Sequence, residues 1–376
     1  PPRSTLFPYT TLFRSFGFDL SVVCAANLYL RDAFQLTPSA MGFATGSAAL
    51  GCIMGPFLGA WMCDAIGRTR TMIVACLLLG IGSLMTAIPP SIAVFNIFRI
   101  VGGVGVGLCS VASPMYISEI APPRMRGGLG VMYQLAIVVG SIVAPFVAYV
   151  IVKVTPESVC WRWMFASEIL PVVVFSVLLL LLPESPRWLA GRGRYDEALG
   201  VMTRVDGAEF ARKEMEQIKA SLAQETGNFS ELFGPGTRYA LLIGLLLAFF
   251  NNWTGWSVIG GYIPMLFEAS GLRDRALGIL QFTVSYACMG VVTLIACWTT
   301  DRAGRRPMWI FASVLMTVVM ALAGAVFHFH LSGWIVLLVI SLCTIPHGIA
   351  LGPLPWLMIS EIFPTRLRAR SVADNG

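Results

Sequence analysis

The chain has 376 residues, of which 56% are hydrophobic and only 12% are charged. Soluble domains carry about 45–50% apolar and about 25% charged residues, so this composition argues against a water-soluble fold and excludes a disordered chain, collagen and a coiled coil. The net charge of +6 comes mostly from arginines scattered in loops, and without a soluble basic domain we expect no nucleic-acid partner.

Runs with few or no charges recur along the chain, and about 20 apolar residues are enough to span a bilayer as a helix. In chain order the runs cover 16–30, 33–63, 71–98, 100–118, 127–152, 161–183, 239–267, 276–300 and 307–360. The last run is too long for one crossing, and a break at 328–333 divides it into two helices. The pattern predicts an all-α polytopic membrane protein with about ten helices.

The order of the runs predicts a division into two halves. Residues 16–182 supply an N-terminal half with helices 1–6, and 183–237 form a polar linker with short helices, including a charged helical pattern at 208–224. Residues 238–376 supply a C-terminal half with helices 7–10, in which helices 11 and 12 are expected to be missing. Segment 1–15 is rich in proline where a first helix should begin, and we expect it to be non-native.

Two short passages recur in the same order in both halves. The motif at 64–70 is echoed at 301–306, and the motif at 118–126 is echoed at 360–368. Both echoes lie six predicted helices further along the chain, so chance is a poor explanation for them. We predict two parallel six-helix halves, an arrangement that is typical of transporters.

Arginine and lysine are concentrated in the loops that follow the even-numbered helices. The positive-inside rule therefore predicts that the linker and the C-terminus are cytoplasmic, in a multi-pass protein of the inner or plasma membrane. Glycines at four-residue spacing on helix 2 (Gly51, Gly55 and Gly59) and on helix 4 (Gly103 and Gly107) predict close packing between helices.

From Phe16 onward the chain resembles the sugar porter family of the major facilitator superfamily. The likeness is carried by 99–126, which fits the helix 4 signature, by the PESPRWL sequence at 183–189, and by GPLPW at 352–356 with SEIFP at 360–364. It most resembles proton-coupled bacterial sugar symporters of the xylose type. The resemblance implies transmembrane transport of a monosaccharide, coupled to protons, by alternating access.

Asp19 and Arg99 are charges inside apolar runs. A charge at the bilayer centre costs about 2.5–3.5 kcal/mol on insertion scales, so each must face a partner or an aqueous path. A carboxylate is ionised beside a guanidinium and takes up a proton when it is desolvated or separated from it. The resemblance implies that Asp19 is the proton acceptor and Arg99 its partner; the alternative is a static pair that pins helix 1 to helix 4.

Amides offer a sugar hydroxyl both a donor and an acceptor without a charge. The resemblance implies that four residues bind the sugar: Gln134, Asn251, Asn252 and Trp356. Hydrogen bonding between helices is the alternative role for the two asparagines, and Trp253 and Trp256 are expected to line the cavity or to face lipid. Three family amides are replaced here, by Ser141, Ser257 and Met289, so the identity of the sugar stays open.

Charged residues at the cytoplasmic helix ends are expected to form a gate that bridges the halves, with helix capping and orientation as the alternative role. The resemblance implies five pairs: Asp64 with Arg68, Glu119 with Arg126, Glu184 with Arg187, Asp301 with Arg305, and Glu361 with Arg368. One gate state keeps such pairs and the other breaks them, which is the differential interaction that alternating access needs.

Without a nucleophile-and-base pair or a metal-ligand cluster in the sequence, we expect neither an enzyme nor a bound cofactor or metal. The expected partners are a sugar, protons and the lipid bilayer, with the protein acting as a monomer. The alternatives are a passive facilitator for a sugar or polyol, a carrier of another small organic solute, and a membrane sugar sensor that does not transport.

Overall fold

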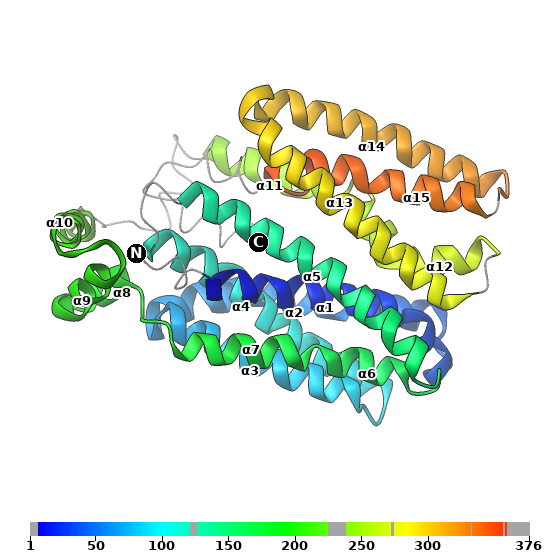
Figure 1. The fold of residues 1–376 in the computed structure, drawn as a ribbon, viewed down its shortest axis with the longest axis horizontal. Helices are drawn as coiled ribbons and strands as arrows, with labels where there is room; N and C mark the ends of the chain where they lie inside the picture. The colour runs from blue at the N-terminus through cyan, green and yellow to red at the C-terminus, as the bar shows by residue number, and fades with distance from the viewer. Residues whose placement is uncertain are drawn as a thin grey trace.

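The computed structural model describes residues 7–120, 126–224, 238–271, 274–331, 333–355 and 358. Within these ranges the chain forms helices joined by short connections, without any strand, and most of the helices run roughly along one direction (Figure 1). The predicted all-α class is therefore confirmed.

The described residues of the N-terminal part form seven helices. They are α1 (Phe7–Phe34), α2 (Pro38–Ile66), α3 (Arg68–Ala87), α4 (Ile92–Ile120), α5 (Arg126–Val154), α6 (Cys160–Ser167) and α7 (Ile169–Leu180). The sixth predicted helix is thus α6 followed by α7, interrupted at Glu168. Helix α1 begins at Phe7, which lies inside the segment 1–15 that we expected to be non-native.

Local signals explain two of these boundaries. The Thr37 side chain accepts a hydrogen bond from the backbone N–H of Ala40 at 3.3 Å, and Pro38 follows at the first helical position, so α2 starts with an N-cap residue and a proline. Gly67 separates α2 from α3 with a φ of +102°, a conformation that glycine adopts without the steric cost of a Cβ atom.

The linker and the C-terminal part follow. The linker helices are α8 (Pro186–Gly191), α9 (Tyr195–Asp206) and α10 (Ala208–Gln224), the last covering the charged pattern expected at 208–224. Then come α11 (Arg238–Asn252), α12 (Trp256–Ala269), α13 (Arg275–Ala303), α14 (Arg305–His328), α15 (Trp334–Pro346) and the π-helical turn η3 (His347–Leu351). The expected break at 328–333 lies between α14 and α15.

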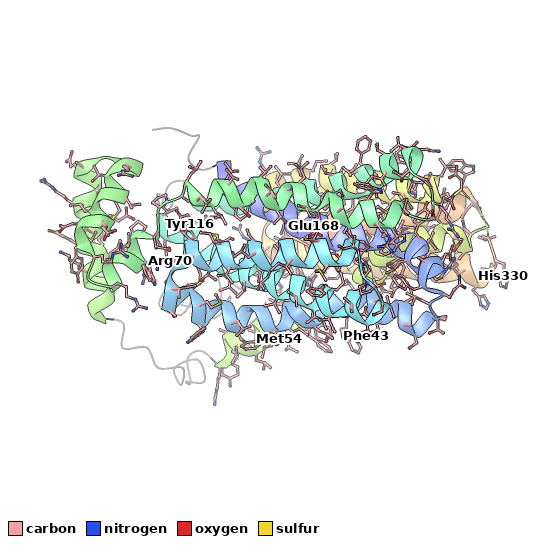
Figure 2. The ribbon with its side chains drawn as sticks, turned by 90° about the horizontal axis from the view of Figure 1, so that it is seen from below. Phe43, Met54, Arg70, Tyr116, Glu168 and His330 are labelled. Carbon is pink, nitrogen blue, oxygen red and sulfur yellow. The ribbon has the colours of Figure 1, made fainter. Side chains whose placement is uncertain are left out.

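Eight helical spans of the described chain are long and apolar enough to cross a membrane. The seventh predicted helix is divided into two shorter apolar helices, α11 and α12. Large apolar side chains on the outside of the bundle are exposed, as Phe43 and Met54 on α2 illustrate (Figure 2). An apolar outer surface of this kind fits a protein that is surrounded by lipid.

The linker helices lie at one end of the bundle, with Arg70 nearby, and His330 lies at the opposite end (Figures 1 and 2). One buried apolar cluster joins α1 and α5 of the N-terminal part to α12, α13 and α14 of the C-terminal part. A second cluster lies among α2, α3, α4 and α7 and continues into the linker helices. The two parts of the chain therefore share one core, and the linker helices pack on the N-terminal part.

Helices α2 and α4 pack through their glycines, as predicted. A Cβ atom on Gly51 would overlap the carbonyl oxygen of Ile100, and one on Gly103 would overlap that of Ala48. Gly55 and Gly107 meet backbone to backbone in the same way. This contact fixes α4, the helix that carries Arg99, against α2.

We predict that Gly51→Ala destabilises the protein by about 1–3 kcal/mol, because the added methyl group overpacks the α2–α4 contact. Gly46→Ala is the matched control on the same helix, since a Cβ atom there meets nothing within 4 Å and alanine favours the helix. The measurement is the free energy of unfolding in mixed detergent micelles. Equal effects of the two substitutions would contradict the close packing.

Candidate functional site

An ion pair lies in the interior of the helix bundle. The Nη1 atom of Arg99 on α4 donates to Oδ1 of Asp19 on α1, and the two residues are only 4% and 3% exposed. Among the described residues, Oδ2 of Asp19 and both Nε and Nη2 of Arg99 have no hydrogen-bond partner. The structure thus brings the two expected charges together and leaves them with spare hydrogen-bonding capacity.

A second acid belongs to this site and was missed by the sequence analysis. Glu168, between α6 and α7, is 1% exposed and lies close enough to interact with Asp19, Arg99 and the Ser83 side chain. Its Oε1 atom is buried and has no partner among the described residues. The signal was present, because Glu168 interrupts an apolar run and an acid within a membrane span is a functional candidate by default.

The site therefore contains two carboxyl groups and one guanidinium. If both acids are ionised, the group has a net negative charge in the bundle interior, where an unpaired charge is costly. The electrically neutral form carries one proton on one of the acids. The arrangement is chemically able to hold and release a proton.

A helix break lies next to the predicted sugar-binding asparagines. Helix α11 ends at Asn252, and α12 begins at Trp256 after Gly255, which has a φ of +83°. The carbonyl oxygen of Asn251 accepts from the hydroxyl of Thr254 at 2.8 Å. Broken helices at membrane depth are tolerated where they are buried in protein or line a cavity, and in transporters they form binding sites.

The two asparagines are placed differently. Asn251 is partly buried, and its Oδ1 atom is buried without a partner among the described residues. Asn252 is exposed and donates through Nδ2 to the carbonyl oxygen of Ala248 at 3.0 Å. Of the pair, Asn251 is the one with a free acceptor inside the protein.

Aromatic side chains surround the start of α12. Trp256 is 5% exposed and stacks on the imidazole of His347 with ring centroids 5.2 Å apart, and Tyr286 lies 5.9 Å from the same indole. Trp253 is 75% exposed. The two tryptophans, which were expected to line the cavity or to face lipid, thus differ: Trp256 faces the protein interior, and Trp253 lies on the outer surface of the protein.

The substituted amide positions have structural roles where they are described. The Ser141 hydroxyl donates to the carbonyl oxygen of Gly17 at 3.3 Å, which ties α5 to α1. Met289 on α13 is buried against Gly348 of η3. The side chains of Gln134 and Ser257, and Trp356 as a whole, lie outside the described residues.

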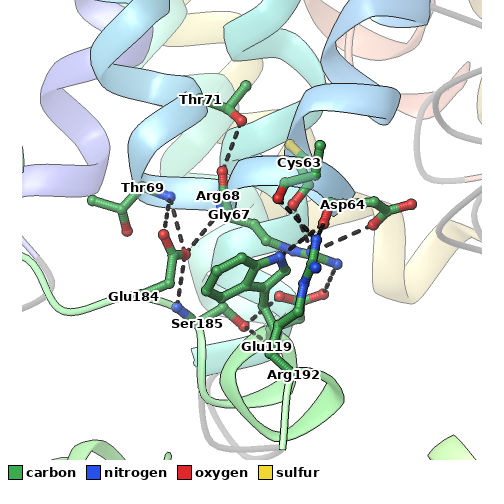
Figure 3. Close-up of polar contacts among 12 residues, drawn as sticks. Cys63, Asp64, Gly67, Arg68, Thr69, Thr71, Glu119, Glu184, Ser185 and Arg192 are labelled. Carbon is green, nitrogen blue, oxygen red and sulfur yellow. Dashed lines mark hydrogen bonds and ion pairs between the residues drawn. The ribbon is translucent and has the colours of Figure 1, made fainter. Parts of the chain in front are cut away.

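A polar network joins the linker to the ends of α2, α3 and α4 (Figure 3). The buried guanidinium of Arg68 pairs with Glu119 at 2.9 Å and with Asp64 at 3.4 Å. The Ser185 hydroxyl donates to the second oxygen of Glu119. The carboxylate of Glu184 accepts from the backbone N–H groups of Arg68 and Thr69, at the N-terminus of α3, where the helix dipole favours a negative charge.

Of the expected gate pairs, Asp64 with Arg68 is present, and Glu119 is engaged by Arg68 and Ser185. Glu184 binds backbone amides at the start of α3 and at Ser185, and Arg187 of the neighbouring α8 has contacts of its own. Arg305 on α14 is also engaged. Four partners in the expected pairs lie outside the described side chains: Arg126, Asp301, Glu361 and Arg368.

The linker itself is anchored by this network. Trp188 of α8 and Arg192, which directly follows α8, donate to the carbonyl oxygen of Asp64 at 3.0 and 2.9 Å. The hydroxyl of Tyr116 donates to the carbonyl oxygen of Pro183 at 2.7 Å. These bonds cap the carbonyl end of α2 and fix the start of the linker on α4. Within the described chain, the His, Cys, Asp and Glu side chains form no group that could hold a metal ion.

Comparison with known proteins gives consistent matches over nearly the whole chain. The profile of a family described as "Sugar (and other) transporter" matches residues 6–373. The arabinose-proton symporter of Bacillus subtilis (strain 168) is 35% identical over 362 residues, which cover 95% of this chain and 78% of the relative. The D-xylose-proton symporter of Escherichia coli (strain K12) is 33% identical over 390 residues, covering 95% and 79%.

The fold is also similar to a solved structure. The major facilitator superfamily proton:xylose symporter XylE from E. coli, bound to 6-bromo-6-deoxy-D-glucose, superposes with a TM-score of 0.85 and 31% identity, covering 99% of this chain and 84% of that one.

We predict that Glu119→Gln lowers the free energy of unfolding by about 3 kcal/mol or more, because it leaves the buried Arg68 guanidinium without its main counter-charge. The matched control is Glu197→Gln, which breaks the exposed ion pair of Glu197 with Arg194. Exposed pairs contribute little, so the control should unfold like the parent protein. A Glu119→Gln variant as stable as the parent would show that the network is not a structural anchor.

Proposed function

The chain belongs to the sugar transporter family of the major facilitator superfamily, and on this basis we propose that it carries a monosaccharide across the membrane together with protons, by alternating access of its two helical halves. The relatives reported above are named for arabinose and xylose transport with protons, and a pentose is therefore the first substrate to test. The single observation that carries the proposal is the buried site of Asp19, Arg99 and Glu168.

We place the linker and the C-terminus on the cytoplasmic side of the cell membrane. The distribution of arginine and lysine supports this orientation. The end of α12, the start of α13 and the C-terminal end of α1 then lie on the extracellular side, which is the end of the bundle away from α8–α10 (Figure 1).

In the proposed mechanism Asp19 is the proton carrier. While Asp19 is paired with Arg99 it is ionised, and when α1 shifts away from α4 the isolated carboxylate takes up a proton. While Asp19 is ionised, Glu168 carries the one proton of the neutral site, because a single guanidinium balances only one of the two acids. Protonation of Asp19 weakens the attachment of α1 to α4, so proton binding and helix position change together.

Helix α1 connects the proton site to the proposed sugar site. Eight residues after Asp19, the amide of Asn27 donates to the carbonyl oxygen of Gly261 on α12 at 3.3 Å. Helix α12 begins at the break that carries Trp256, beside Asn251. A movement of α1 is therefore transmitted directly to α12, the helix that follows the break, through this hydrogen bond.

We propose that the sugar binds at this break, with the free Oδ1 atom of Asn251 accepting from a hydroxyl group. The stacked pair of Trp256 and His347 supplies an aromatic wall for the C–H face of the sugar ring. A few polar groups in a mostly apolar cavity are sufficient to orient a small ligand. Gln134 and Trp356 complete the proposed set.

We predict that Asp19→Asn abolishes sugar accumulation driven by an inward proton gradient in liposomes, while exchange of labelled for unlabelled sugar is retained. Asparagine cannot carry the proton, but its amide has nearly the shape of the carboxyl group. Glu168→Gln is the matched variant: it imitates the protonated acid, and we expect it to keep gradient-driven uptake at a reduced rate.

Other outcomes of the same assay would contradict the proposal and support a different function. Uptake that ignores both the gradient and Asp19→Asn would make the protein a facilitator with a structural ion pair. Sugar binding without uptake would favour a sensor. Loss of accumulation in Glu168→Gln, with Asp19→Asn unaffected, would exchange the roles of the two acids.

For the sugar site, we expect Asn251→Ala to raise the KM for the transported sugar about tenfold or more, because a hydroxyl group loses its buried partner. The neighbouring Asn252→Ala should leave KM nearly unchanged, since the Asn252 side chain is exposed and bonded to its own helix. Initial rates of uptake over a range of sugar concentrations measure both. Equal effects would mean that the helix break, rather than Asn251, accounts for binding.

A further inference from the structure

Five charged side chains gather at the end of the bundle away from the linker. Arg31 and Asp32 lie at the end of α1, Glu157 lies between α5 and α6, Glu268 is in the last turn of α12, and Arg275 starts α13. The side chains of Arg275, Arg31 and Glu268 are 24%, 32% and 33% exposed, whereas those of Asp32 and Glu157 are 45% and 71% exposed.

The ion pairs of this group cross between the two halves of the chain. Arg31 binds Glu268 through two hydrogen bonds, at 3.1 and 3.3 Å. Arg275 donates to Asp32 at 2.6 Å and lies 3.9 Å from Glu157. Each of these contacts joins α1 or the α5–α6 connection to α12 or α13.

Arg275 is the centre of the group. It also approaches Glu268 of its own half at 3.7 Å, and its guanidinium lies over the ring of Tyr29 on α1, 5.5 Å from the ring centroid. Partial burial acts to raise the pKa of Asp32, but the hydrogen bonds from Arg275 and Arg31 outweigh it and hold that pKa below its usual value. Asp32 is thus ionised and paired in this arrangement.

We propose that Arg31, Asp32, Glu157, Glu268 and Arg275 form an ionic latch that holds the extracellular entrance closed and sets the balance between the inward-facing and outward-facing states. The proposal rests on the alternating access and the orientation proposed above. Directly behind the latch lies the contact of Asn27 with Gly261, so opening a path from outside requires α1 to part from α12 and α13.

Each ion pair of the latch is weak enough to break when the gate opens. An exposed ion pair shifts an equilibrium by at most about fivefold, and several pairs that break together multiply their effects. Opening separates the pairs between the halves, whereas contacts within each half persist. The latch therefore acts on the population of states and not on the folding of either half.

The test uses a reporter cysteine in place of Thr45, whose hydroxyl donates to Asn27 at 3.2 Å behind the latch. A membrane-impermeant maleimide is added from outside to the protein in oriented vesicles, and the protein without the reporter gives the background of the native cysteines. We expect Arg275→Gln to raise the labelling rate about five- to tenfold, and Arg31→Glu to raise it about fivefold.

The charge swap distinguishes a latch from a general loss of structure. Arg31→Glu combined with Glu268→Arg rebuilds the pair in reverse and should return labelling to within about twofold of the parent. Arg194→Gln, which breaks an exposed pair on the linker, should change nothing. A swap that stays as reactive as the single variant, or single variants that label like the parent, would overturn the latch.

Labelling does not depend on transport, so the two proposals fail separately. Gradient-driven uptake with unchanged labelling in every variant would reject the latch alone. Increased labelling that the swap reverses, in a protein that moves no sugar, would retain the latch and reject transport.

Discussion

A charge that is buried among membrane helices must have a partner, and much of this structure follows from how Asp19 and Arg99 meet that constraint. The pair joins α1 to α4. Because α4 is packed backbone to backbone on α2, the ion pair also attaches α1 to this closely packed pair of helices. Glu168 adds a second acid beside the same guanidinium. In the proposed mechanism, protonation of this site therefore controls how firmly α1 is attached to α4.

Backbone geometry serves two purposes in this bundle. In the N-terminal half, glycines allow α2 and α4 to approach closely, which leaves no room for a ligand between these two helices. In the C-terminal half, the break between α11 and α12 and the π-helical turn at His347–Leu351 interrupt the ladder of hydrogen bonds. Such irregular turns are frequent at functional sites, and here they bring Trp256 and His347 face to face.

The fold class, the order of the helices and the packing role of the glycines could be predicted from the sequence, because hydrophobic runs and residue size express them directly. The pairing of Asp19 with Arg99 could also be predicted, because each is a charge within an apolar run and needs a partner. Other features depend on three-dimensional placement. Nothing in the sequence shows that Glu168 lies beside Asp19 and Arg99. Asn251 and Asn252 are neighbours in sequence, and the helix break gives them different burial. Ser141 looked like a lost ligand, but its hydroxyl ties α5 to α1.

The charges at the two ends of the bundle differ in a way that fits their positions. At the linker end, the side chains of Arg68 and Glu119 are only 9% exposed and belong to the same half, and removing one partner of a buried pair costs about 3–5 kcal/mol. At the opposite end, Arg31, Glu268 and Arg275 are partly exposed and join different halves, where each pair is worth about 0–1 kcal/mol. Only the second kind can break and re-form while the halves stay folded. A transporter needs stable halves and a weak interface between them. The burial of these charges gives strong ion pairs within one half and weak ion pairs between the two halves.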